Sequence, residues 1–387
     1  MRSTALSAWL VASAVAPAAE PAELRGDAQA VERIINENYA YLERLPGGRY
    51  SLSDKLRAES QAVSSPRDLV RFSERALSLL ADHHAITGGS LSESWAVVPS
   101  FADLWIARKG GDFIIEQVRE GSPAEQAGIR GGDIVAAIDG VATATAVASF
   151  WADLGVSGGG ARDGYAARVL AAGRRDRPRR VTVRSGGSQR EHLLPNLYSL
   201  PQRKLDPVTA TNRDGEYRIR VNDSLGDDAT ISAFDQAMAA APKGRRLVID
   251  LRDTPSGGNT TIGRAILGWF VTRPTFYQVH NLPAEFRRTG VARQWAEQVL
   301  PRAGKHYARP VTVRVGRWTG SMGEGLAIGF AALGARVEGT RMAGLLGAIY
   351  DHKLPSSGQI IKIPTERLYA VDGTPREDFV PSATPRR

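Results

Sequence analysis

Apolar residues return at helical spacing in the first part of the chain. Between residues 27 and 80 they recur every three or four positions, which predicts a set of helices. The last of these opens with Ser65 as its N-cap and runs directly into Asp82, His83 and His84. We therefore expect both histidines at the exit of a helix.

Residues 98–195 change to short strand-like runs that are separated by glycine-rich turns. A run at 113–118 precedes the turn Gly-Ser-Pro-Ala at 121–124, and a second run at 134–138 follows Gly-Gly-Asp. This pattern predicts a small domain of strands with a short helix. The stretch 155–180 is longer and richer in glycine and arginine than such a domain needs, so we interpret it as an inserted loop.

Beyond residue 210 strands and helices alternate, a rhythm typical of α/β layers. The continuous apolar run 247–251 predicts a central strand, and a second strand is predicted at 311–315. Ser321 follows this second strand at the start of a helical run, the place where open α/β sheets carry their chemistry. A serine at this position either caps the helix or acts as a nucleophile.

The composition is that of a soluble globular protein that is long enough for two or three domains. Of its 387 residues 42% are apolar and 24% are charged. The net charge of +9 is scattered, with one arginine cluster at 174–180 that we interpret as a solvated loop, so we infer no nucleic-acid partner. The absence of cysteine excludes disulfides, thiolate catalysis and cysteine metal sites.

No metal or cofactor is expected. Four histidines show no ligand spacing, and each is expected on the surface or in a loop: His192, His280, His306 and His352. The segment 286–301 is interpreted as an amphipathic helix, with a lid or a clamp for a substrate carboxylate as the alternative.

The N-terminus predicts export. Residues 1–19 combine a basic start at Arg2, an apolar stretch from Ala5 to Val15 and small residues, which resembles a secretory signal with its cleavage site. No later segment is apolar for long enough to cross a bilayer. We therefore expect a periplasmic or secreted protein without a stable membrane span.

The motifs of the later regions resemble two known families. Gly-Ser-Pro-Ala at 121–124 and Gly-Asp-Ile at 132–134 resemble a PDZ domain of the bacterial protease type, which implies binding of extended peptides at a sheet edge. Three further strings resemble the C-terminal processing, or tail-specific, serine peptidases. They are Leu-Val-Ile-Asp-Leu-Arg at 247–252, Pro-Ser-Gly-Gly at 255–258 and Thr-Gly-Ser-Met-Gly-Glu at 319–324.

The resemblance implies an α/β protein of three parts behind the signal. These are a helical N-terminal region, a PDZ-like β/α domain and a crotonase-like α/β catalytic core, at residues 24–95, 98–195 and 210–387. The resemblance also favours the nucleophile over the helix cap for Ser321. It implies an oxyanion hole made by the amide of Met322 and that of Gly257 or Gly258.

The general base departs from the tail-specific branch of the family. That branch uses a lysine in a Phe-Gly-Lys-Gly stretch, whereas this chain has Ala-Gly-Leu-Leu-Gly at 343–347. A second branch, which includes the tricorn core, uses a histidine from the helical region and a late glutamate. Its strings resemble Leu-Ala-Asp-His-His at 80–84 and Asp-Gly-Thr-Pro-Arg-Glu at 372–377, which assigns the base to His84 and the orienting acid to Glu377.

These residues predict an exported serine endopeptidase that cleaves unfolded or C-terminally presented polypeptides by Ser-His-Glu chemistry. His83, where the second branch has a serine, either supports the relay by hydrogen bonding or faces solvent. Two other hypotheses stay open: a non-catalytic protein that binds a peptide or an apolar ligand in the same cleft, and a peptidase with Lys353 as its base. The sequence contains no signal for an oligomeric state.

Overall fold

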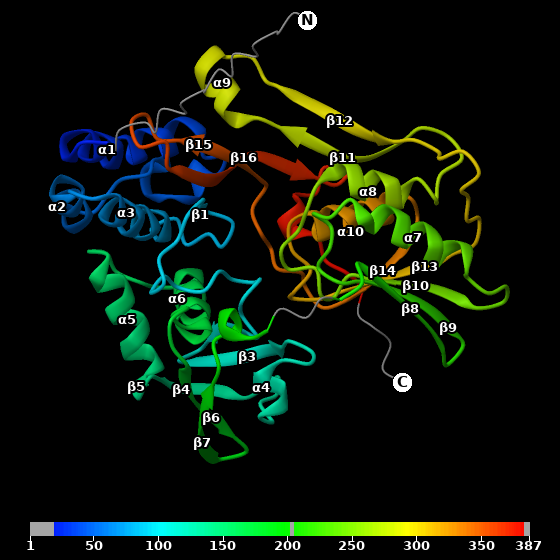
Figure 1. The fold of residues 1–387 in the computed structure, drawn as a ribbon, viewed down its shortest axis with the longest axis horizontal. Helices are drawn as coiled ribbons and strands as arrows, with labels where there is room; N and C mark the ends of the chain where they lie inside the picture. The colour runs from blue at the N-terminus through cyan, green and yellow to red at the C-terminus, as the bar shows by residue number, and fades with distance from the viewer. Residues whose placement is uncertain (1–18, 202–204, 383–387) are drawn as a thin grey trace, which may run out of the picture.

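The computed structural model describes residues 19–201 and 205–382 of the chain (Figure 1). Almost all of the predicted signal segment, residues 1–18, lies outside the described residues. Within the described ranges, no helix has both the length and the apolar content that a membrane span requires. The fold is a mixed α/β structure, as predicted, and its three parts pack against one another.

Helices build the N-terminal part, as predicted. They are α1 (Pro21–Asn38), α2 (Asp54–Ala62) and α3 (Pro66–Ser78), with the short 3-10 turns η1 (Leu42–Arg44) and η2 (Pro46–Gly48). The N-cap of α3 is confirmed, because the Ser65 hydroxyl accepts a hydrogen bond from the Asp68 amide. Leu69 and Phe72 of α3 are fully buried in one apolar core with Val31 of α1.

A five-stranded antiparallel sheet with a short sixth strand forms the middle part. Its order is β2-β3-β4-β6-β7, made by β2 (Leu104–Lys109), β3 (Asp112–Val118), β4 (Ile134–Ile138), β6 (Arg179–Ser185) and β7 (Ser188–Leu194), with β5 (Val141–Ala142) beside β4. Its helices are α4 (Pro123–Gln126), α5 (Thr143–Asp153) and α6 (Ala161–Ala172), and the 3-10 turn η3 (Leu197–Ser199) follows the sheet.

The inserted stretch 155–180 is not only a loop, because it contains α6. Eight of the twelve residues of α6 are buried, on all sides of the helix. A helix that is buried all round has no alternation of apolar and polar faces, so its sequence lacks the periodic signal that predicts a helix. The prediction of a loop was therefore wrong for residues 161–172.

The C-terminal part holds a sheet in the order β14-β13-β10-β9-β8, in which all neighbours are parallel except β8 and β9. The strands are β8 (Val208–Arg213), β9 (Glu216–Val221), β10 (Arg246–Asp250), β13 (Val311–Val315) and β14 (Arg336–Gly339). Its helices are α7 (Ala229–Ala239), α8 (Thr260–Leu267) and α10 (Met322–Ala332). The predicted strands at 247–251 and 311–315 are confirmed as β10 and β13.

A second, antiparallel sheet links this core to the N-terminal helices (Figure 1). It contains β1 (Ile86–Thr87), β11 (Thr275–Asn281), β12 (Gln294–Val299), β15 (Ala348–Lys353) and β16 (Ile360–Tyr369). β1 follows the histidine pair and adds to the edge of β16, so it holds the exit of α3 beside the C-terminal part. The 3-10 turn η4 (Arg376–Asp378) closes the described chain.

The helix predicted for residues 286–301 is only partly correct. The helix α9 (Pro283–Thr289) ends at Gly290, which has a φ of 72°. The chain then forms β12, whose backbone pairs with β11 over six residue pairs. The ladder bonds to a neighbouring strand outweigh the local helical preference.

Candidate active site

Ser321 lies on a strained turn between β13 and α10. Its φ of 50° and ψ of −113° place a non-glycine residue in a region that L-amino acids rarely adopt. Such a conformation costs on the order of 1–3 kcal/mol and is typical of functional sites. The preceding residues Trp318 and Thr319 are buried. Ser321 itself, the residue directly before α10, is half-buried.

Glu324 fixes this turn from inside the protein. The Ser321 amide donates to Glu324 Oε2 at 2.9 Å, in a capping box. The amides of Gly344 and Leu345 donate to the same carboxylate at 2.8 and 3.3 Å. Glu324 is fully buried, and burial raises its pKa to about 7. It therefore joins the Ser321 turn to the segment 343–347.

The two glycines of the loop before α8 have different surroundings. A Cβ on Gly257 would lie 2.4 Å from the Ser321 Cβ and 3.1 Å from the Met322 nitrogen, and Gly257 has a φ of 70°. Only glycine fits this close approach. A Cβ on Gly258 would instead meet the Leu225 oxygen at 1.9 Å. Of the two candidate glycines, Gly257 therefore lies against Ser321, whereas the atoms nearest to Gly258 belong to Leu225.

His84 is buried at the exit of α3. Its Nδ1 donates to the backbone oxygen of Leu346 at 2.7 Å, and its backbone amide donates to Asp82 at 2.9 Å. Because a carbonyl only accepts, Nδ1 carries the hydrogen and Nε2 is the basic nitrogen. Burial, helped by the nearby charge of Arg376, lowers the pKa of His84 to about 4. The imidazole is therefore neutral near pH 7.

Glu377 and Asp82 lie in one polar cluster next to His84. Tyr41 donates its hydroxyl to Glu377 at 3.4 Å, and Arg44 pairs with Glu377 at 3.3 Å. Tyr39 donates to Asp82 at 3.0 Å, and burial raises the pKa of Asp82 to about 6. The cluster gathers residues from both ends of the chain.

The structure does not join the three predicted catalytic residues by hydrogen bonds. Within residues 19–201 and 205–382, no hydrogen bond links His84 to Ser321 or to Glu377. Instead the segment 343–347 lies between them, since its amides bind Glu324 beside Ser321 and its Leu346 carbonyl binds His84. Arg376 holds the same segment through the carbonyls of residues 345 and 347, at 2.9 and 2.6 Å.

His83 is half-buried and contacts α6 of the middle part. Its Nε2 accepts a hydrogen bond from Arg168 of α6 at 2.9 Å, and its ring stacks on Tyr165 with 4.4 Å between centroids. Burial and the Arg168 charge hold the pKa of His83 well below its usual range. His83 is therefore a neutral hydrogen-bond acceptor for α6.

The expectation that the other histidines lie on the surface or in loops was wrong for His280. This residue is buried on β11, where it bonds Glu297 at 3.0 Å and Glu366 on its other nitrogen, and it stacks on Trp295. Although burial opposes it, the bonds to Glu297 and Glu366 raise the pKa of His280 to about 9. The carboxylates of Glu297 and Glu366 stabilise the buried positive charge of His280. They come from other strands, so the local sequence around His280 does not predict this pairing.

Lys353 makes no contact with Ser321 that would support a role as its base. It is exposed on β15, and among the described residues no hydrogen bond or ion pair connects it with Ser321. Glu324 and Arg376 were not predicted as parts of the site. The Ser-x-x-Glu spacing of a capping box is the signal that points to Glu324.

The middle part is docked on both loops next to Ser321. Arg317, in the turn before Ser321, pairs with Glu116 of β3 at 2.6 Å. Arg119 pairs with Asp253, in the glycine loop, at 2.9 Å. These ion pairs are half-buried, and they hold the two loops against one side of the middle sheet.

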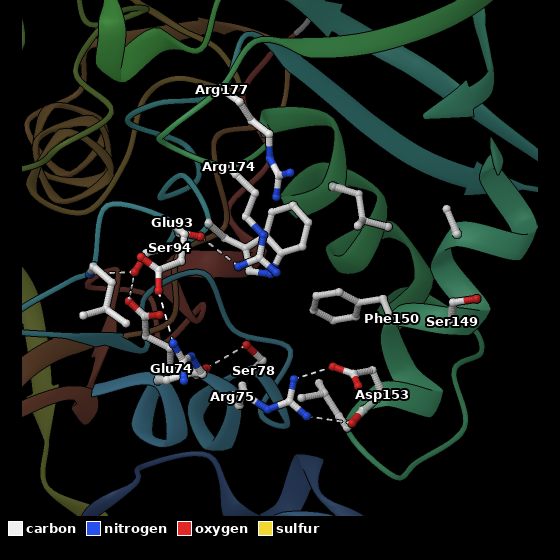
Figure 2. A pocket seen from close by; sticks show the side chains of 16 residues that line it. Glu74, Arg75, Ser78, Glu93, Ser94, Ser149, Phe150, Asp153, Arg174 and Arg177 are labelled. Atoms are coloured by element: carbon white, nitrogen blue, oxygen red, sulfur yellow. Dashed lines mark hydrogen bonds and ion pairs between the residues drawn. The ribbon is translucent and has the colours of Figure 1, made fainter. Parts of the chain in front are cut away.

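A cavity of about 480 Å³ lies apart from this site, between α3 and α5 (Figure 2). Figure 2 shows Phe150 facing into it, and Arg75 bound to Asp153 at its edge. Neither Ser321 nor His84 lines the cavity. The residues that line it come from the N-terminal and middle parts.

Comparisons with known proteins match two stretches of the chain. Residues 114–148 match the PDZ domain family, and residues 218–380 match peptidase family S41. No match was found among curated proteins.

Solved structures of proteases share the fold. The photosystem II D1 C-terminal processing protease is 17% identical with a TM-score of 0.55, and the match covers 93% of each chain. The crystal structure of mature CPAF is 14% identical with a TM-score of 0.60, and the match covers 94% of this chain and 92% of that one. The chain is therefore a serine-type peptidase, in which residues 218–380 are similar to peptidase family S41 and residues 114–148 to a PDZ domain.

Proposed function

We propose that this chain is an exported serine endopeptidase that hydrolyses unfolded or C-terminally presented polypeptides, with Ser321 as nucleophile, His84 as base and Glu377 as acid. The observation that carries the proposal is the strained Ser321 turn. Its amide is fixed by Glu324, and Gly257 lies directly against its side chain. A serine that only capped a helix would need neither the strain nor the bare glycine.

Each group has a defined task in this proposal. His84 Nε2 removes the Ser321 proton while Oγ attacks the peptide carbonyl, and it then returns that proton to the leaving amine as the C–N bond breaks. Water attacks the acyl-serine in the second half, with His84 again as base. The amide of Met322 lies at the positive end of α10, and a Cβ on Gly257 would lie 3.1 Å from the Met322 nitrogen, so we assign the oxyanion hole to the amides of these two residues.

The proposal requires His84 to reach Ser321 when substrate is bound. The segment 343–347 binds His84 directly and binds Glu324, which holds the Ser321 amide. A shift of this segment would therefore bring His84 and Ser321 closer to each other. Glu377 supports the imidazolium from the polar cluster that it shares with Asp82 and Tyr41. Apo peptidases commonly complete such bonds only with substrate present.

Hydrolysis of casein tests this function. Ser321→Ala is expected to abolish cleavage, whereas Ser65→Ala removes a true helix cap and is expected to keep it. Casein cleavage by Ser321→Ala at the unmodified rate contradicts the proposal. An unmodified protein that binds peptide but never cleaves it favours the alternative of a binding protein on the same fold.

Export rests on residues 1–19 alone. Expression of the full chain in a bacterium and sequencing of the mature N-terminus tests it. A product that starts near residue 20 in the periplasmic fraction is expected. Full-length protein that stays in the cytoplasmic fraction contradicts export.

A further inference from the structure

The helix α6 lies where a peptide ligand of a PDZ domain would bind. Such domains take an extended peptide as an added strand on a free sheet edge. The edge strands of this sheet are β2 and β7, and α6 packs along β2. On its other side α6 packs against α5, beside which it is drawn in Figure 1. It therefore fills the space between the edge strand and the neighbouring helix.

Side chains and backbone of α6 occupy the groups of β2 that a peptide would need. Arg168 donates to the backbone oxygen of Ile106 at 2.8 Å, so this edge carbonyl is already bonded. Asp163 forms an ion pair with Arg108 of β2. A Cβ on Gly164 would lie 3.7 Å from the Ile106 oxygen, so the helix backbone runs close to the strand.

The contact with α5 is apolar and aromatic. Tyr165 of α6 lies with its ring centroid 6.0 Å from that of Trp151, which is fully buried. Ala166 and Ala167 are also fully buried. Removal of α6 would expose apolar surface on the helix, on β2 and on α5 together, which opposes its displacement.

Arg168 also connects this groove with the proposed catalytic segment. The same guanidinium that binds Ile106 donates through Nε to His83, the neighbour of His84. Tyr165 stacks on the His83 ring. A side chain in the groove thus holds the segment that carries the expected base.

We propose that α6 permanently fills the peptide groove of the PDZ domain, and that Arg168 uses this position to hold the segment of His83 and His84. The domain is then a scaffold and not a receptor for peptide ends. The positioning role rests on the function proposed above, whereas the filled groove does not. Substrate chains must reach Ser321 without adding a strand to β2.

Thiol labelling tests whether α6 stays in place. The chain has no cysteine, so a single Ala167→Cys change introduces one buried thiol, and Ala161→Cys introduces an exposed one on the same helix as the control. Both are made with Ser321→Ala, so that the readout is exposure and not hydrolysis. The probes are decapeptides that end in Ala, Val, Leu or Phe with a free carboxylate, and their amidated twins.

The buried thiol of the Ala167→Cys variant is expected to react with Ellman's reagent at least about 100-fold more slowly than the exposed thiol of the Ala161→Cys control, because local opening of a buried helix is rare. Peptide at saturating concentration should leave both rates unchanged. A several-fold faster reaction of the buried thiol with the free-carboxylate peptides, and not with the amidated ones, overturns the proposal.

A second variant opens the groove. Asp163→Lys places like charges at the Arg108 pair, and Asp176→Lys makes the same charge change on an exposed loop as the control. Peptide binding is measured by fluorescence anisotropy, with both variants made in the Ser321→Ala chain. We expect the Asp163→Lys variant to bind the free-carboxylate peptides at least about tenfold more tightly than the Asp176→Lys control does. Equal binding by the chain with Asp163 intact overturns the proposal, whatever the variant does.

Discussion

His84 donates its Nδ1 hydrogen to the backbone oxygen of Leu346 at 2.7 Å. Leu346 belongs to the segment 343–347, where a tail-specific peptidase would carry its lysine. The amides of this segment bind Glu324, whose carboxylate also fixes the Ser321 amide. The segment 343–347 thus contacts both the expected base and the turn of the expected nucleophile.

Replacement of the base is predicted to slow catalysis. His84→Gln keeps a donor for the Leu346 carbonyl but has no basic nitrogen, so kcat should fall about 10²–10⁴-fold with little change in KM. The assay is steady-state cleavage of a fluorogenic peptide. His352→Gln, on β15 and bonded to Thr365, is the control that should keep full activity. An unchanged kcat for His84→Gln removes His84 from the mechanism.

Activity is predicted to decline only at a low pH on the acid side of the pH profile. His84 must be neutral to act as base, and its pKa of about 4 keeps it neutral well below the ordinary value of about 6.5. kcat/KM should therefore stay level as the pH falls from 7 to about 5 and decline near 4. Because Arg376 contributes to the low pKa, Arg376→Met should move the decline to higher pH. A decline near pH 6.5 in the unmodified protein contradicts this assignment.

Gly257→Ala is predicted to remove activity while the fold is kept. The new Cβ would clash with Ser321 and displace the glycine-loop amide, and loss of one oxyanion donor costs about 10²–10³-fold in kcat. Gly290→Ala is the matched control, because it has a φ of 72° against 70° but no neighbour within 4 Å. Both variants are compared by kcat and by their melting temperature. Equal activities for the two variants contradict a role for Gly257 at Ser321.

The stability of the protein is predicted to depend on Glu324. Its folded pKa of about 7 exceeds the unfolded value of about 4.3, so the stability from its protonated form is complete below pH 4.3 and is lost as the pH rises through 7. The free energy of unfolding in urea should fall by about 3 kcal/mol at most between pH 5 and pH 8. In the Glu324→Gln variant this fall should be absent. Glu191→Gln, at an exposed position, should leave the slope unchanged. If the free energy of unfolding of Glu324→Gln depends on pH as in the unmodified protein, another group is responsible for the dependence.

The sequence predicted those elements that carry a strong local signal. The apolar runs that became β10 and β13 and the N-cap at Ser65 were confirmed, because burial on both faces and capping leave clear local patterns. The helix α6 and the strand β12 were missed. Their conformation depends on surfaces supplied by other parts of the chain, and a short window of sequence does not contain those surfaces.

The candidate site was predictable only as a set of residues. Motif strings pointed to Ser321, Gly257 and His84, but the contacts among them depend on distant pairings. The hydrogen bond between His84 and Leu346 joins residues that are 262 positions apart. Arg168, which donates to His83, lies in the stretch 155–180 that was interpreted as an inserted loop. Neither contact has a local signal.

The nucleophilic role of Ser321 is tested most directly by labelling with a fluorophosphonate, followed by peptide mapping in a mass spectrometer. A serine activated by a base forms a stable phosphonyl adduct, whereas a helix cap does not. We predict one adduct per chain, on the peptide that contains Ser321, and none after Ser321→Ala. An unmodified protein that folds but takes up no label, or takes it up at another serine, contradicts the central claim.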